Sequence, residues 1–270
     1  RPLEHIRLKG EDVRKGALLL SPGERLNAGK LSLCAAAGIV TLKCGRQPMV
    51  GLLATGDELS ETGKPLSSGQ IYESNRLTLS VLASQAGAFV KVYPIVIDSL
   101  DATTGALNRA FDECDYVITS GGVSVGELDY IKPSFEAGGG ILDFWRVSIK
   151  PGKPFVFGKR GTKLLFGLPG NPVSAFVTFL LMVRPALLRA QCARETGLRS
   201  VLGRTGERFV NRGDRRHFLR VKFGADHAIY SAGVQASHML SSLSQAEALL
   251  DLQPNSTLEA GVPVSVLVWD

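Results

Sequence analysis

The chain has 270 residues, a formal net charge of +6 and an apolar content of 44%. This length exceeds one average domain and predicts two domains with an extra segment. No run approaches the roughly 18 apolar residues of a membrane-spanning helix, so a membrane protein is not expected. Four cysteines lie far apart without a Cys-x-x-Cys pair. They predict neither a zinc site nor a disulfide framework, and reduced, mostly buried thiols in a cytoplasm fit best.

The positive charge would permit nucleic-acid binding, but the arginines toward the C-terminal end are not interleaved with stacking aromatic residues. We interpret them mainly as a solvated basic face, with attraction of small anions as the alternative. They are Arg204, Arg208, Arg212, Arg215, Arg216 and Arg220. No nucleic-acid partner is predicted.

Residues 1–45 predict a connector segment, with a short strand over 17–20 and a helix over 28–37 that Gly38 ends. Residues 46–197 alternate strands and helices with short connections, which predicts right-handed crossovers and a three-layer α/β/α domain with a mostly parallel sheet. The expected strands are 50–54, 89–97, 116–118, 155–157 and 163–166, and the expected helices are 74–87, 101–113 and 173–189, with a further helix start at 126–129.

Residues 198–270 change to short apolar runs separated by Gly, Asp or Asn, with strands expected over 216–223, 228–231 and 262–269. This pattern is typical of a small β domain, and we expect one of barrel-like form.

A glycine doublet follows the apolar run at 116–118. Ser120-Gly121-Gly122 predicts a tight turn in which the backbone can approach a ligand closely. A following helix start at 126–129 would direct unpaired N–H groups at an anion, most simply a phosphate. The alternative is a glycine turn that only joins two elements.

Acidic residues lie at the expected carboxyl ends of three segments. Glu58, Asp98 and Asp129, with Asp57, suit a hard divalent cation such as Mg²⁺, which takes one or two carboxylates plus phosphate oxygens and water. Asp98 could equally cap a helix, and Asp129 could be stabilised by a helix dipole alone.

The Lys150-Pro-Gly-Lys153-Pro loop, with Arg146 before it, presents cations on a stiff backbone. Fixed cations suit phosphate or a tetrahedral oxometalate, and the alternative is a basic surface turn. Ser74, Asn75 and Asn171 could cap helices or touch a ligand. The four histidines His5, His217, His227 and His238 lack ligand spacing, so we interpret them as structural or surface residues.

Several motifs, in this order, resemble the molybdopterin molybdenumtransferase family, which is related to the E domain of gephyrin. They are Thr-Gly-Asp-Glu-Leu at 55–59, Gly-Gln-Ile-Tyr at 69–72, Ser-Asn-Arg at 74–76, Ser-Gly-Gly-Val-Ser-Val-Gly at 120–126 with Asp-Tyr at 129–130, Lys-Pro-Gly-Lys-Pro at 150–154 and Gly-Leu-Pro-Gly-Asn-Pro-Val-Ser at 167–174.

The resemblance implies a cytoplasmic enzyme of molybdenum cofactor biosynthesis. Such an enzyme takes molybdopterin adenylate and molybdate as substrates, uses Mg²⁺, inserts molybdenum and releases AMP. It also implies a homodimer, with hand-over of substrate from a molybdopterin adenylyltransferase, and no membrane partner. By position, Glu58, Asp98, Asp129 and Lys150 match functional residues, and the three acids would hold the metal. The expected substrate contacts are Thr55, Gly56, Asp57, Ser74, Asn75, Ser120, Gly121, Gly122, Val123, Ser124, Gly126, Arg146, Lys153, Pro169, Gly170 and Asn171.

The chain departs from the family pattern in three places. It begins after an N-terminal portion that contributes an Asp and a Thr to the family's site, apparently from the partner subunit. Arg146 stands where a lysine is usual, and Ala236 replaces a glycine in a Gln-Gly-Ser-His run. Two alternative functions are a dimeric binding scaffold of the gephyrin kind and a molybdopterin adenylyltransferase of the same fold.

Overall fold

The computed structural model describes residues 5–123 and 129–269 of the chain. The residues Ser124 and Gly126, and the expected helix start at 126–128, lie outside the described residues.

A six-stranded sheet in the order β4-β1-β5-β9-β8-β6 forms the middle layer of the molecule. Strands β4, β1, β5 and β9 are parallel, whereas β8 is antiparallel to both of its neighbours. The bounds are β1 Met49–Ala54, β4 Phe89–Val92, β5 Tyr116–Ser120, β6 Ile141–Trp145, β8 Val156–Arg160 and β9 Lys163–Leu168. The predicted α/β class with a mostly parallel sheet is therefore confirmed.

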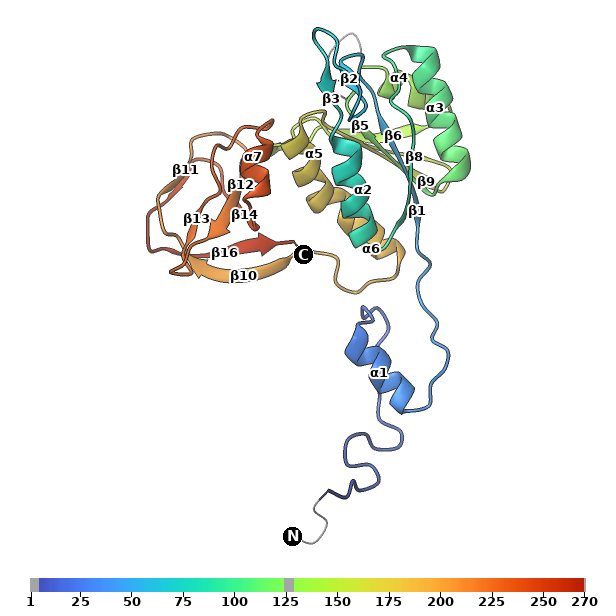
Figure 1. Ribbon diagram of the computed structural model, residues 1–270, viewed down its shortest axis with the longest axis vertical. Helices are drawn as coiled ribbons and strands as arrows, with labels where there is room; N and C mark the ends of the chain where they lie inside the picture. The colour runs from blue at the N-terminus through green and yellow to red at the C-terminus, as the bar shows by residue number, and fades with distance from the viewer. Residues whose placement is uncertain (1–4, 124–128, 270) are drawn as a thin grey trace.

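Helices cover both faces of this sheet (Figure 1). One face packs on a large apolar cluster with α2 (Asn75–Gln85), α5 (Pro172–Thr178), the π-helical turn η1 (Phe179–Val183) and α6 (Arg184–Ala190). The other face packs on a second cluster with α3 (Leu100–Glu113) and α4 (Ile131–Ala137). The two clusters account for the three layers, because each face of the sheet buries its own set of side chains.

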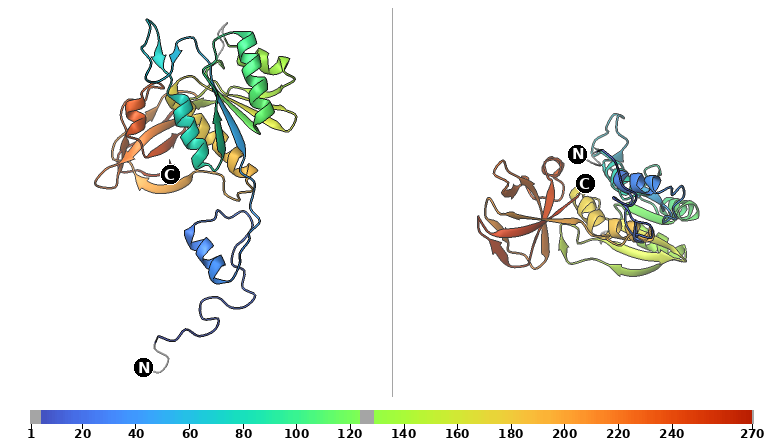
Figure 2. Two further views of the ribbon diagram at one scale, coloured as in Figure 1. Left: turned by 45° about the vertical axis from the view of Figure 1, so that its right-hand side comes forward. Right: turned by 90° about the horizontal axis from the view of Figure 1, so that it is seen from below.

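The N-terminal segment contains α1 (Ala28–Ala36) and extends away from the sheet (Figures 1 and 2). Its helix is confirmed, but the strand expected over 17–20 is wrong, since no strand forms there. A strand needs a partner, and residues 17–20 lie in the segment that leaves the sheet. Of the four cysteines, Cys34 and Cys114 are buried, whereas Cys44 and Cys192 are exposed, which corrects the expectation of mostly buried thiols.

The C-terminal part is rich in β structure. Its main sheet has the order β10-β16-β14-β12-β13, and β11 pairs with β15. The bounds are β10 Arg199–Arg204, β11 Phe209–Asn211, β12 Arg216–Phe223, β13 Ile229–Ser231, α7 Leu240–Ser244, β14 Ala248–Leu252, β15 Ser256–Leu258 and β16 Pro263–Val268. The barrel-like form stays a prediction, as does the division into residues 1–45, 46–197 and 198–270.

A two-residue strand joins the two parts of the molecule. Strand β7 (Ile149–Lys150) pairs in parallel with β12, with Ile149 opposite Arg216 and Lys150 opposite His217. The lysine loop therefore belongs to both parts of the structure.

Three element boundaries differ from the sequence prediction for local reasons. Strand β4 ends at Val92 rather than Ile97, because Pro94 has no N–H for the ladder. Helix α3 begins at Leu100 and is capped by Ser99, whose Oγ accepts a bond of 3.2 Å from the Ala102 N–H, so the alternative of Asp98 as a helix cap is wrong. Helix α4 begins at Ile131, which leaves Asp129 before the helix.

The long apolar helix is present from Pro172 to Ala190. By length and composition alone it could cross a membrane, but 56% of its apolar window is buried inside the protein. Ser174, Thr178 and Arg184 interrupt this helix, so the expectation that no uninterrupted run of about 18 apolar residues occurs is not contradicted. The burial shows a core helix packed on the sheet.

Replacing Leu187, which is 0% exposed on α6, tests this packing. Leu187→Ala is expected to lower the free energy of unfolding by about 2–5 kcal/mol, because the cavity adds to the lost apolar burial. The matched variant Leu202→Ala alters a side chain that is 85% exposed. It is expected to change the free energy of unfolding by less than about 1 kcal/mol. Urea denaturation measures both, and equal effects would contradict the assignment of α6 to the core.

Candidate active site

The glycine doublet forms a turn that only glycine fits. Gly121 and Gly122 have φ angles of 87° and 64°, in the region that side chains disfavour. A Cβ on Gly121 would lie 2.7 Å from the Thr55 carbonyl oxygen, and a Cβ on Gly122 would lie 2.8 Å from Thr55 Oγ1. The turn after β5 therefore packs directly on the end of β1.

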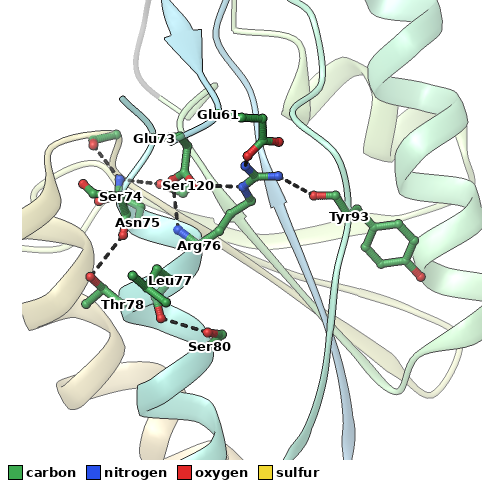
Figure 3. A network of polar contacts seen from close by, with 11 residues as sticks. Glu61, Glu73, Ser74, Asn75, Arg76, Leu77, Thr78, Ser80, Tyr93 and Ser120 are labelled. Atoms are coloured by element: carbon green, nitrogen blue, oxygen red, sulfur yellow. Dashed lines mark hydrogen bonds and ion pairs between the residues drawn. The ribbon is translucent and has the colours of Figure 1, made fainter. Parts of the chain in front are cut away.

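Asn75 ties this turn to two other segments. Its Nδ2 donates to Ser120 Oγ and to the Gly170 carbonyl oxygen, each at 2.7 Å, and Figure 3 shows Asn75 reaching Ser120 from the start of α2. The N–H of Gly121 donates to the Leu168 carbonyl at 3.1 Å. The glycine turn, the start of α2 and the Pro-Gly-Asn loop before α5 thus form one connected surface.

The capping interpretation of Ser74 and Asn171 is wrong. Each occupies the N-cap position of its helix, α2 or α5, yet its side chain makes no capping hydrogen bond among the described residues. Asn75 lies in the first turn of α2 and bonds across to other loops. Ligand contact stays a prediction for Ser74 and Asn171.

The Thr55 hydroxyl is buried beside the glycine turn. Thr55 is 6% exposed, and its Oγ1 has no hydrogen-bond partner in the part of the chain that the structure describes. Because a buried hydroxyl without a partner costs free energy, a ligand oxygen at this point would stabilise it.

The acids come together at the neighbouring strand ends. The Asp98 N–H donates to Asp57 Oδ1 at 3.0 Å, and the Asp57 N–H donates to Asp98 Oδ2 at 3.4 Å. Glu58 folds back, so that its carboxylate oxygens lie 2.6 and 2.8 Å from the position of a Cβ on Gly56. Partial burial raises the pKa of Asp98, and the charges of Asp57, Glu58 and Asp129 raise this pKa further, while the Asp57 N–H lowers it. These four acids therefore share one electrostatic neighbourhood.

We tested whether these acids suit a divalent cation. Within residues 5–123 and 129–269, no group of three or more His, Cys, Asp or Glu side chains lies close enough to hold a metal ion. The carboxylates are the right donors for Mg²⁺ and repel one another, as the raised pKa of Asp98 shows. A cation held by one or two of them, with phosphate oxygens completing its shell, fits this donor set.

The lysine loop lies at the junction of the two parts, against α5. A Cβ on Gly152, whose φ is 107°, would lie 2.5 Å from Thr178 Cγ2, and Arg215 Nη1 donates to the Ile149 carbonyl at 3.0 Å. Lys150, Lys153 and Arg146 are all exposed. Lys150 pairs with His217 on β12, whereas Asp57 and Asp98 are bonded to each other at the strand ends of the sheet, so the lysine loop is treated as a second region.

Sequence reasoning missed a buried arginine in this second region. Arg220 is 0% exposed, and its Nη2 donates to the Val234 carbonyl at 2.6 Å. Its Nε and Nη1 have no partner among the described residues, and burial lowers the pKa of Arg220. The interpretation of Arg220 as part of a solvated face is therefore wrong. The available signal was strand alternation, because Phe218 and Arg220 share one face of β12.

The side-chain amide of Gln235 holds the backbone of Arg220. The Arg220 N–H donates to Gln235 Oε1 at 2.9 Å, and Gln235 Nε2 donates to the Arg220 carbonyl at 2.8 Å. The same loop reaches α5, since the Val173 N–H donates to the Ser237 carbonyl at 3.1 Å. Arg220 is thus held in a fixed position at the junction with α5, as a buried positive charge.

His217 is buried beside these cations. It is 6% exposed and its Nε2 has no described partner. Burial lowers the pKa of His217 to about 4, and the charges of Lys150, Arg220 and Arg215 lower this pKa as well. The imidazole is therefore neutral near pH 7, which fits the structural interpretation of this histidine.

Comparison with known proteins identifies the family. Residues 51–189 match the family model described as probable molybdopterin binding domain, and residues 203–269 match the MoeA C-terminal region, domain IV. A molybdopterin molybdenumtransferase of Haemophilus influenzae is 39% identical over 98% of this chain and 67% of its own length. Molybdopterin molybdenumtransferase 2 of Mycobacterium tuberculosis is 34% identical over 100% of this chain and 68% of its own length.

Among solved structures, the molybdopterin biosynthesis MoeA protein from Pyrococcus horikosii superposes with a TM-score of 0.84 and 29% identity. The match covers 97% of this chain and 64% of that protein. The fold and site thus define a two-part protein with a molybdopterin-binding type of α/β domain. The chain belongs to the molybdopterin molybdenumtransferases, a family of enzymes of molybdenum cofactor biosynthesis, and spans about two thirds of the length of these relatives.

The low pKa of His217 predicts how stability depends on pH. The unfolded chain takes up a proton at His217 near pH 6.5 and the folded chain near pH 4, so the unfolded state binds more protons between these values. The free energy of unfolding should therefore fall as the pH is lowered from 6.5 to 4. His217→Gln should flatten this fall relative to His227→Gln, which alters an exposed histidine. Urea denaturation at pH 7, 6 and 5 tests this, and identical pH slopes in both variants would contradict it.

Proposed function

We propose that the chain inserts molybdenum from molybdate into adenylated molybdopterin and releases AMP. The observation that carries this proposal is the cluster of Asp57, Glu58, Asp98 and Asp129 beside the glycine turn. A substrate with a pyrophosphate link needs N–H groups and hydroxyls for its oxygens and carboxylates for an accompanying cation. The family membership supports the same reaction.

The pyrophosphate would lie along the connected surface of loops. The Gly122 N–H and the Thr55 hydroxyl, which has no partner among the described residues, would contact its oxygens, while the Gly121 N–H stays bonded to the Leu168 carbonyl. Asn75 would keep the turn and the Pro169-Gly170-Asn171 loop at a fixed separation through its two bonds. Fixed donors of this kind stabilise developing negative charge without reorganising during the reaction.

One or two of Glu58, Asp98 and Asp129 would hold Mg²⁺, with phosphate oxygens completing its shell, and Asp57 would fix Asp98 through the paired backbone bonds. A bound cation of this kind withdraws electrons from the phosphoryl group and neutralises charge on the leaving phosphate. The segment with Asp57 and Glu58 and the segment with Asp98 meet at the ends of neighbouring strands. The position of their carboxylates would therefore determine where the pyrophosphate is cleaved.

Molybdate would bind in the second region. Lys150, Lys153 and Arg146, which are all exposed, would attract the oxyanion. The buried charge of Arg220, which acts on His217 together with Lys150, would add to the positive potential of this region.

We further propose a cytoplasmic homodimer that receives its substrate from a molybdopterin adenylyltransferase. The exposed apolar side chains of α2, Leu77 and Val81, at 72% and 48% exposure, support a surface that a second copy covers. The gephyrin-like scaffold remains the alternative of a different class. Unpaired buried donors and clustered acids support catalysis over a scaffold, because both cost stability when no ligand is bound.

Asp98→Asn tests the role of the acids. AMP release from molybdopterin adenylate is expected to fall by about 100-fold, because the amide supplies no charge to the cation. The melting temperature of the free protein should stay equal or rise, since the substitution removes repulsion. Asp101→Asn, on the exposed start of α3, is the matched control and should keep its activity. Full activity in Asp98→Asn would contradict the proposal.

Lys153→Gln separates the oxyanion region from the acids. The KM for molybdate is expected to rise about tenfold, because one of the cations that attract the oxyanion is removed. The KM for molybdopterin adenylate should be unchanged. Lys222→Gln, on the exposed surface, serves as the control. Steady-state kinetics with each substrate varied in turn measures the two KM values, and an equal rise in both would argue against a separate molybdate site at the lysine loop.

A further inference from the structure

Arg76 is a buried arginine to which the proposed reaction gives no role. It is 6% exposed, and all three of its guanidinium nitrogens are used (Figure 3). Nε donates to Glu73 Oε2 at 2.8 Å, Nη2 donates to Glu61 Oε2 at 2.7 Å, and Nη1 donates to the Tyr93 carbonyl at 2.6 Å. The Arg76 N–H also donates to Glu73 Oε1 at 2.9 Å.

These bonds join the two segments that carry the acids. Glu61 lies on the segment that begins with Asp57 and Glu58, and Tyr93 begins the segment that leads to Asp98. At their other ends, Asp57 and Asp98 exchange backbone-to-carboxylate bonds. Arg76 and the Asp57–Asp98 pair therefore hold the two segments together at opposite ends, and the Gly56 N–H adds a bond of 3.2 Å to the Val96 carbonyl beside the acids.

Few other contacts hold the first segment. Residues 62–69 and the side chains of Asp57 and Glu58 are exposed. Its only regular structure in the described chain is the pairing of β2 (Leu59–Ser60) with β3 (Ile71–Tyr72), two residues on each side. A segment with so little buried apolar surface depends on polar contacts for its position.

The acids themselves oppose this arrangement. Asp57 and Asp98 exchange backbone-to-carboxylate bonds, and Glu58 follows Asp57 directly in the chain, so like charges lie close together and the segments that carry them repel one another. The guanidinium of Arg76 attracts the Glu61 carboxylate on one segment and binds the backbone of the other, and thereby counters the repulsion. A group that fixes metal-binding carboxylates from outside sets their geometry as much as the carboxylates do.

We propose that Arg76 is a positioning residue for the acid cluster, which it holds in register by bonding Glu61 on one segment and the Tyr93 carbonyl on the other. It touches neither substrate nor cation. The proposal rests on the proposed function only for its kinetic consequence, which is a higher affinity for Mg²⁺ during the reaction. Its structural consequence, a fixed spacing between residues 57–61 and 97–99, holds independently of the reaction.

Glu61→Ala is the sharpest variant. Replacing Arg76 itself would leave Glu73 buried without its partner and could unfold the protein. The side chain of Glu61 is 43% exposed, so its replacement is tolerated. The substitution removes the bond from Arg76 Nη2 to Glu61 and keeps the Arg76–Glu73 pair. The matched control is Glu259→Ala, which removes the exposed ion pair of Glu259 with Arg208 in the C-terminal part.

The first measurement is hydrogen exchange of the full chain. In Glu61→Ala the amides of residues 57–61 and 97–99 should exchange about fivefold faster, as expected when a bond worth about 1 kcal/mol is lost. Amides of β1 and α2 should be unchanged, and Glu259→Ala should match the unaltered protein at all of these positions. Unchanged exchange at residues 57–61 and 97–99 would overturn the proposal.

The second measurement is AMP release as a function of Mg²⁺. The concentration of Mg²⁺ that gives half the maximal rate should rise about tenfold in Glu61→Ala, the size of effect typical of residues that orient metal ligands. The KM for molybdate should be unchanged. A lower kcat with the same Mg²⁺ dependence would show that Arg76 only stabilises the fold, which also overturns the proposal. If the unaltered chain releases no AMP, the proposed function fails, and hydrogen exchange alone decides the positioning role.

Discussion

The site depends on the register of three parallel strands. Ala54 on β1 pairs with Ser120 on β5, and Ser120 pairs with Leu168 on β9, so the three strands end at the same level. The loops that follow them must then start side by side at one edge of the sheet. The close approach of the glycine turn to Thr55 and the bonds of Asn75 are consequences of this register.

Charges of one sign gather at two places among the described residues. At the strand ends, partial burial and the charges of Asp57, Glu58 and Asp129 raise the pKa of Asp98. At the junction with the C-terminal part, Arg220 is fully buried, and two of its nitrogens have no described partner, beside a neutral His217. Each arrangement costs stability in the free protein, and opposite charges on a ligand would offset this cost. Structures keep such features where binding requires them.

Local chemistry allowed much of the α/β fold and its glycine turn to be predicted. Apolar runs followed by Gly121, Gly122 and the acids at 57 and 58 marked the strand ends correctly, because these signals lie within a few residues. The errors arose where contacts between residues far apart in the sequence determine a side chain's burial or hydrogen bonding. Ser74 occupies a cap position without capping, and Arg220 looked solvated, because its burial depends on how β12 packs on another part of the chain. The pairing of β7 with β12 joins residues 149–150 to 216–217, beyond the range of any local pattern.

Calorimetric titration of the chain with molybdopterin adenylate, in the presence and absence of Mg²⁺, tests the central claim most directly. The account predicts one adenylate bound per chain, with an affinity that rises when Mg²⁺ is present, because the clustered acids and the pyrophosphate oxygens share the cation. Binding that is indifferent to Mg²⁺, or no binding at all, would contradict it.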